Sequence, residues 1–296
     1  MSTPLQHGPA AARPLLARAA QTAGEANGYA GAVACYEFDA LCRTVLEQPQ
    51  QLEEVVPEVM ATVCARLEAD VEAREVRTPH VYSLAYSLLD VRGIRFMGRH
   101  FPSGVRYLEP LVHTLAAVQA GPPPEIGPPP AGQPRNSFTQ VDAATLPDKL
   151  AFRMQYVLLY WLSILVMSPF DVGALDTDGA LSATLVQACL SYRRLSSKLT
   201  QMANEALARF LVRSDCAALR DEVVGRANDA VEAAAGQARR VSSETAAYLS
   251  CCASWCASRA RPGCGCAWCG TPGACSACWR TRTASCARWW PCSARA

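Results

Sequence analysis

The cysteines near the C-terminus are the side chains whose spacing comes closest to a chemical site. A Cys-x-Cys-x-x-Cys run covers residues 264–269, and a Cys-x-x-Cys pair covers residues 275–278. Four thiolates from two such pairs can hold a zinc ion in a tetrahedron. Only five residues separate the pairs, fewer than in the usual zinc knuckle, and no Leu, Ile, Val, Met or Phe follows Leu249 to build a core around a metal. We therefore expect no metal-ligating residues.

The composition of this tail differs from that of the rest of the chain. From Cys251 to the end there are ten Cys, five of the six Trp and six Arg, but no Lys, Asp or Glu. Ala, Arg, Gly, Pro, Cys, Trp and Ser are what a GC-rich coding region yields when it is read out of frame. Three interpretations remain open, in this order: a frame error or aberrant splice, a natural disordered tail, and a zinc module.

The rest of the chain lacks the residue patterns of catalysis. It has no phosphate-binding loop, no Gly-x-Gly-x-x-Gly and no His-Glu-x-x-His, and its four histidines are scattered. His80 and His113 fall on expected helices and are typical of surface or capped histidines. The five cysteines before residue 250 follow no metal-binding spacing, and they are typical of small buried apolar residues in a reducing compartment. We expect no catalytic residue and no cofactor, so the protein is not expected to be an enzyme.

The spacing of apolar residues from about residue 32 to residue 237 is helical. They recur at steps of three and four, the period of a helix with one buried face, and no stretch alternates with the period of a strand. We expect one helix that begins near Pro102, where a proline starts the first turn. Other helices are expected over residues 52–67, 78–92, 148–167, 181–195, 198–212 and 217–237. Pro57 falls inside the first of these, so a kink there or a late start near Glu58 is expected.

Composition divides the chain into five parts. Residues 121–135 include seven prolines, which lack a backbone N–H and so favour an extended spacer over a helix. A proline-rich ligand is the alternative, but no basic residue flanks the prolines before Arg135. The expected parts are a disordered N-terminus (1–31), helical repeats (32–120), a proline-rich spacer or insertion (121–147), further helical repeats (148–249) and the tail (250–296).

The spacing of the helices favours a repeat architecture. Two successive helices take up about 35–45 residues, as in HEAT and armadillo repeats. The fold class is therefore expected to be all-α, a helical solenoid, with a compact bundle as the competing architecture. The most apolar run, Tyr156 to Met167, covers about 18 Å of helix against a bilayer core of about 30 Å. We expect no transmembrane segment. The net charge of +2 is also too small to attract nucleic acid to the protein surface as a whole.

Three segments resemble, in order, stretches of the tubulin-folding cofactor D family. The run Tyr156-Val-Leu-Leu-Tyr-Trp161-Leu-Ser, followed by Pro169-Phe170-Asp171, resembles the family's Tyr-Val-Leu-Leu-Leu-Trp-Leu-Ser run that ends in Pro-Phe-Asp. Residues 91–110 resemble its Lys-Val-Arg, Phe-Pro and Glu-Pro stretch, and residues 206–215 its Arg-Phe-x-x-Arg-Pro-Asp stretch. The family has Arg where this chain has Gln155, and Pro where it has Ser214. The signature residues are Tyr156, Trp161, Pro169, Phe170, Asp171, Arg209, Phe210, Arg213 and Asp215.

The resemblance implies both a fold and a function. It implies a HEAT/armadillo-type solenoid that matches the N-terminal part of longer chains, so an N-terminal fragment is expected. It implies a chaperone that captures β-tubulin after the chaperonin and helps to assemble the α/β heterodimer. The implied partners are α-tubulin, cofactors C and E and an Arf-like small GTPase, and a GTPase-activator role in the complex follows. The implied location is the cytoplasm, at the microtubule cytoskeleton. A generic HEAT-like interaction scaffold unrelated to tubulin is the alternative.

The signature residues themselves are expected to be structural. Burial preference places Trp161 and the leucines around it in the core between repeats. Pro169 is expected to end its helix, Phe170 to pack back against the protein, and Asp171 to cap the next element. We assign no residue to a tubulin contact.

Overall fold

The computed structural model describes residues 29–44, 53, 56–125, 146–177, 179–192 and 198–236, and every regular element in these ranges is a helix. The predicted all-α class is therefore confirmed for this part of the chain. The expected N-terminal disorder, apart from the helix that starts at Tyr29, lies outside the described residues, as do most of the proline-rich spacer and the whole cysteine-rich tail.

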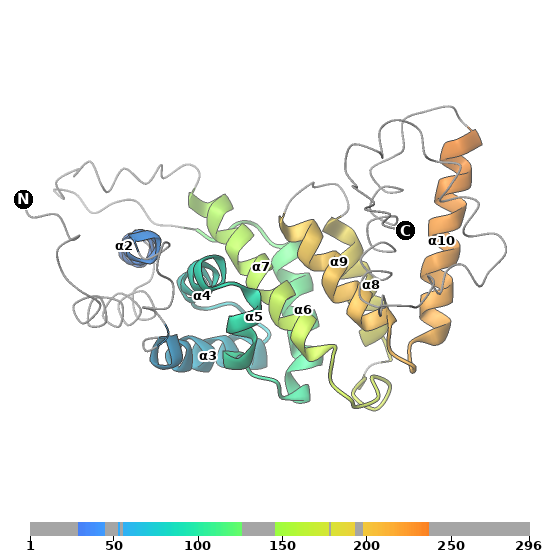
Figure 1. Cartoon of the computed structure of the whole chain (residues 1–296), viewed down its shortest axis with the longest axis horizontal. Coiled ribbons are helices and arrows are strands. Elements are labelled where there is room, and N and C mark those ends of the chain that lie inside the picture. The colour runs from blue at the N-terminus through green and yellow to red at the C-terminus, as the bar shows by residue number, and fades with distance from the viewer. Residues whose placement is uncertain are drawn as a thin grey trace, which may run out of the picture.

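The helices follow one another with short connections (Figure 1). Two short 3₁₀ turns, η3 (Gly98–His100) and η4 (Val105–Tyr107), join α5 to α6. The α-helices are α2 (Tyr29–Thr44), α3 (Val56–Glu72), α4 (Pro79–Arg92), α5 (Ile94–Met97), α6 (Leu108–Ala120), α7 (Leu146–Leu165), α8 (Leu181–Ser191), α9 (Lys198–Leu211) and α10 (Ala217–Gly236).

The helices form two layers. In the first layer α2 packs on α4, α4 on α7 and α7 on α9; in the second α3 packs on α6 and α6 on α8. The layers are joined by the pairs α3/α4, α6/α7 and α8/α9, and α10 follows against α9. Figure 1 shows these pairs succeeding one another along the long axis of the molecule. Stacked helix pairs, each in contact with its neighbours, are the construction of a helical repeat protein.

Helix α7 is the centre of the core. It contacts α4, α6 and α9, and buried side chains occupy almost every position from Val157 to Leu165. The prediction of a helix over 148–167 is displaced by two residues at each end. The start fits Pro147 in the first turn, where its missing N–H costs nothing, and the end precedes Pro169. None of the described helices combines the length and the apolar character that a membrane crossing requires.

The turn between α3 and α4 is closed by a buried carboxylate. Asp70 accepts hydrogen bonds from the backbone N–H of Thr78 (3.3 Å) and from its hydroxyl (3.1 Å). Thr78 stands at the N-cap of α4 with Pro79 after it, as the sequence suggests, but its side chain does not cap the helix. After α4 the chain turns at Gly93, whose φ of +80° is one that L-residues rarely adopt.

Two predicted helix boundaries are wrong for local reasons. The helix expected from Pro102 begins only at Leu108, because the preceding residues form extended chain and the η4 turn. The helix expected to reach residue 195 ends at Ser191, whose hydroxyl donates to the carbonyl of Ala188 (2.8 Å).

Candidate functional site

The structure brings the three signature segments into contact around α7. Trp161 is fully buried, and its indole N–H donates to the carbonyl of Pro102 (2.7 Å). Its ring lies 5.5 Å from that of Tyr107 and 6.5 Å from that of Phe101. A buried indole N–H needs an acceptor, and the segment at 91–110 supplies it. Trp161 therefore fixes the connection between α5 and α6 onto α7.

The two signature-run tyrosines hold other parts of the same face. The hydroxyl of Tyr160 donates to the carbonyl of Ile94 (2.5 Å), and burial raises the pKa of that hydroxyl to about 12. Tyr156 is half-buried, with its ring edge-on to Tyr86 at 5.2 Å and stacked near Phe152 at 6.3 Å. Burial likewise raises the pKa of Tyr156. Neither phenol ionises near neutral pH, so both act through packing and hydrogen bonding.

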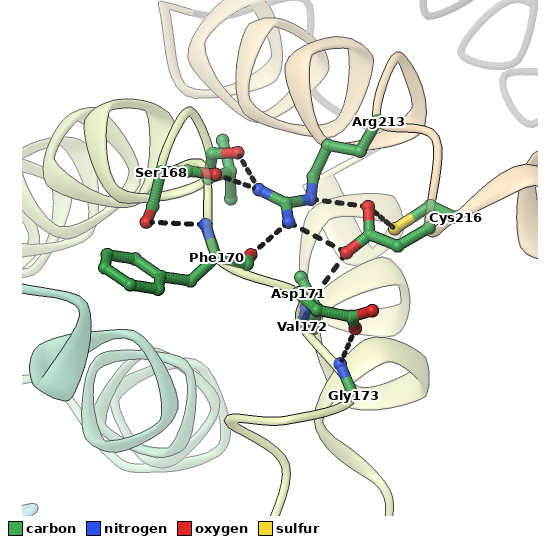
Figure 2. Close-up of polar contacts among 9 residues, drawn as sticks. Ser168, Phe170, Asp171, Val172, Gly173, Arg213 and Cys216 are labelled. Carbon is green, nitrogen blue, oxygen red and sulfur yellow. Dashed lines mark hydrogen bonds and ion pairs between the residues drawn. The ribbon is translucent and has the colours of Figure 1, made fainter.

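Arg213 and Asp215 clamp the loop that follows α7 (Figure 2). The guanidinium of Arg213 binds both carboxylate oxygens of Asp215, at 3.0 and 2.8 Å, and donates to the carbonyls of Val166 (3.1 Å), Ser168 and Phe170. Asp215 in turn accepts the backbone N–H of Val172 at 2.9 Å. The Arg213 hydrogen bonds lower the pKa of Asp215, and the charged pair persists at neutral pH.

Arg209, in the last turn of α9, reaches the same end of α7 as Arg213, which lies in the turn that follows α9. Its guanidinium donates to the carbonyl of Ser163 (3.0 Å) and pairs with Glu205 at 2.8 Å. The last carbonyls of a helix lack intrahelical donors and carry partial negative charge. Two arginines four residues apart therefore satisfy the C-terminal end of α7, while Phe210 between them is fully buried.

The backbone of the loop after α7 is held by Arg213 and Asp215, but two of its apolar side chains face solvent while Val172 is buried. Phe170 is 58% exposed and Met167 is 66% exposed, so the prediction that Phe170 packs back is wrong. The reason is visible in Figure 2: the carbonyl of Phe170 turns toward Arg213, which directs the ring the other way. Pro169, also exposed, lies beyond the end of α7 at Leu165.

Asp171 does not cap the next helix. Its carboxylate accepts the N–H of Gly173 (2.7 Å) in a local turn, eight residues before α8 is reached. Asp176 performs the expected role instead, because it accepts the N–H groups of Ala180 (3.1 Å) and Leu181 (3.0 Å) at the start of α8. Its position before an apolar periodic run was the signal that could have identified it.

Sequence reasoning also missed a polar network inside the first layer. Arg153 on α7 donates to the hydroxyl of Ser83 (2.6 Å) on α4 and lies 3.4 Å from Asp39 on α2. The hydroxyl of Ser87 donates to Asp39 at 2.8 Å. An arginine just before the apolar run of α7 was the only sequence signal. The network ties α2, α4 and α7 together through one charged centre.

The remaining titratable groups offer little chemistry. Within the described ranges no three His, Cys, Asp or Glu side chains are placed to hold a metal ion. Burial raises the pKa of the Cys35, Cys42, Cys64 and Cys189 thiols to about 12, so they are protonated near neutral pH. His80 is buried rather than superficial, and His113 lies 3.8 Å from Glu109, one turn earlier on α6. The polar contacts described above therefore hold the helices in place, and the stacked helices present a surface that a partner can bind.

Comparison with known proteins identifies the family of these repeats. The family model described as tubulin-specific chaperone D-like, ARM repeat, matches residues 44–230, which is more than half of the chain. The match runs from the end of α2 into α10 and includes all three signature segments. No curated protein and no solved structure matches the chain. The predicted armadillo-type repeat is thereby confirmed, and the chain belongs to the tubulin-specific chaperone D-like family.

Proposed function

We propose that this chain is a tubulin-folding cofactor that binds β-tubulin after its release from the chaperonin and assists assembly of the α/β heterodimer. The observation that supports the proposal is the family match over the stacked helix pairs. The described residues fit this role physically, because repeat proteins bind large partners along an extended surface. They carry structural clamps and buried thiols, and a chaperone of this kind acts through contact.

The same proposal covers the partners and the location. The chain acts together with α-tubulin, cofactors C and E and an Arf-like small GTPase. In that complex it contributes to activation of GTP hydrolysis by tubulin, with the hydrolysis chemistry supplied by the GTP-binding protein. It works in the cytoplasm, at the microtubule cytoskeleton.

Co-precipitation with β-tubulin tests the proposal directly. The tagged full chain is mixed with β-tubulin released from chaperonin and, separately, with native α/β-tubulin, and the products are resolved on a native gel. We expect β-tubulin to be retained by the folded chain. Failure to retain β-tubulin, with circular dichroism showing an intact helical fold, would contradict the proposal.

Two variants make the result specific to the repeats. Trp161→Ala removes the fully buried indole that holds the connection between α5 and α6 on α7, and should lose β-tubulin at temperatures at which this variant unfolds. Arg226→Gln changes only an exposed i,i+4 ion pair with Glu222 on α10, and should retain it. Equal retention by the unfolded Trp161→Ala protein would mean that the binding does not depend on the helical repeats.

A further inference from the structure

The connection from α4 to α6 carries an unbalanced group of positive charges. Residues 91–108 include four arginines and one histidine but no Asp or Glu. They span the end of α4, the short helix α5 and the turns η3 and η4 (Figure 1). We call the group formed by Arg92, Ile94, Arg95, Phe96 and Arg99 the α5 surface.

Two guanidinium groups of the α5 surface stack on one aromatic ring. The guanidinium carbons of Arg92 and Arg99 lie 3.9 and 4.0 Å from the centroid of Phe96. Stacking uses the face of a guanidinium and leaves the N–H groups along its edge available for hydrogen bonds, which applies to the exposed Arg99. It also restricts a long side chain in advance, so less conformational entropy is lost when an anion binds. The side chain of Arg92 is only 11% exposed and pairs with Glu53, so Arg92 supports the ring and is not itself open to a ligand.

The charges of this surface are only partly neutralised. Arg92 pairs with Glu53, whereas neither Arg95 nor Arg99 has a carboxylate partner in the portion of the chain that the structure describes. The Nε of Arg99 lies 3.3 Å from the Nε2 of His100. Partial burial and the charge of Arg99 lower the pKa of His100, which is the response expected of a histidine in a positive field.

An apolar contact point lies within the same surface and its backbone is fixed. Ile94 is 41% exposed, between Gly93 and Arg95, while its carbonyl accepts the hydrogen bond from Tyr160 of α7. A ligand that matches the α5 surface must therefore carry carboxylates for the arginine edges and an apolar group for Ile94. Bidentate pairing of arginine with carboxylate is among the stronger polar contacts in proteins.

We propose that the α5 surface binds an acidic peptide segment of a partner protein. A long polyanion fits less well, because residues 1–250 as a whole carry 26 acidic against 22 basic side chains and would repel it away from this surface. An anionic membrane fits less well too, since a single exposed isoleucine gives little apolar area to insert. A short acidic segment engages the local charges and leaves the acidic remainder of the surface untouched.

Fluorescence anisotropy with the full chain under reducing conditions tests the proposal. The probe is a labelled octaglutamate peptide that ends in phenylalanine, and the same peptide with glutamine in place of glutamate is its control. We expect Arg95→Gln with Arg99→Gln to weaken binding about tenfold or more. The matched control is Arg220→Gln with Arg226→Gln on α10, which removes the same charge from residues already paired with Asp221 and Glu222. It should leave the affinity unchanged.

The other outcomes separate the classes of partner. Phe96→Leu should also weaken the octaglutamate peptide, because it removes the stacking ring, while all variants keep the wild-type melting temperature. Raising the salt from about 0.05 to 0.5 M should reduce the affinity, since the charges are exposed. Equal affinity in the two double variants, equal binding of the glutamine peptide, or tighter binding of single-stranded DNA or phosphatidylserine vesicles would overturn the proposal.

Discussion

Removal of the Arg213 guanidinium should uncouple the loop after α7 from α9. The side chains of Arg213 and Asp215 are only 12% and 17% exposed, so their ion pair is largely shielded from water. Arg213→Ala deletes both contacts with Asp215 and the donors to three carbonyls. Breaking a buried pair costs about 3–5 kcal/mol, and because the loop carbonyls can turn to solvent we expect roughly 2–4 kcal/mol here.

The variant Arg213→Lys distinguishes the contribution of the positive charge from that of the guanidinium hydrogen bonds. The ammonium group keeps the positive charge but cannot bind both oxygens of Asp215 and reach the carbonyls on the other side. We expect it to cost roughly 1–2 kcal/mol, so that stability falls from wild type to Arg213→Lys to Arg213→Ala. Urea unfolding followed by circular dichroism measures these differences. A cost below about 0.5 kcal/mol for Arg213→Ala would refute the reasoning, because that is the range of ordinary surface substitutions.

A double-mutant cycle with Asp215→Asn isolates the pair. We expect a coupling energy between Arg213 and Asp215 of about 1 kcal/mol or more. The pKa of Asp215 is lowered in the folded protein, so the pair contributes stability above the ordinary aspartate pKa and loses it as the pH falls through the lowered value. The stability difference between wild type and Asp215→Asn should therefore shrink between pH 7 and acid. A difference that grows on acidification would contradict the assignment of the charged pair.

Four further outcomes are expected. Trp161→Ala should destabilise the protein by about 3–5 kcal/mol, whereas Phe170→Ala should stay within about 0.5 kcal/mol, and thermal unfolding of both distinguishes a buried ring from an exposed one. Burial raises the pKa of Asp70, so wild type should lose stability relative to Asp70→Asn as the pH rises from about 3 to 7; urea titrations at several pH values with the opposite trend would contradict this. In the folded protein at pH 8, iodoacetamide should label Cys35, Cys42, Cys64 and Cys189 far more slowly than after denaturation, as mass spectrometry of the peptides will show. Deleting residues 251–296 should leave the melting temperature and tubulin binding unchanged, because those residues contain no aliphatic side chain other than alanine to offset about 1–2 kcal/mol of ordering entropy each; a dialysis-resistant zinc ion would contradict this.

Sequence periodicity was sufficient for the class of the fold and for the centre of its core. The run around Trp161 is apolar on every side, and a helix of that kind must be surrounded by others, as α7 is by α4, α6 and α9. The start of α3 at Val56 follows from Pro57, which is tolerated only in the first turn of a helix. Which helices pair across the two layers is not encoded by period, because every amphipathic helix presents the same kind of stripe.

The loop after α7 shows where sequence reasoning fails. A phenylalanine after proline has a strong burial preference, so Phe170 was expected to pack inward. Its backbone carbonyl instead accepts a hydrogen bond from Arg213, which is more than forty residues away in sequence. No pattern in the neighbouring residues predicts a contact between residues so far apart in the chain. The same limit applies to Arg153, whose partners on α2 and α4 become neighbours only when the first layer is assembled.

The spacing of Arg209 and Arg213 becomes meaningful once α7 and α9 lie side by side. Arg209 is in the last turn of α9, and Arg213 follows the end of the helix in a turn whose backbone N–H groups still bond to carbonyls of α9. The carbonyls they reach, Ser163 and Val166, belong to the last turn of α7 and the residue beyond it. Moving Arg209 by one residue along the helix would rotate it about 100° away from α7. These two arginines therefore hold the C-terminal end of α7 against the C-terminal end of α9, one from the helix and one from the turn after it.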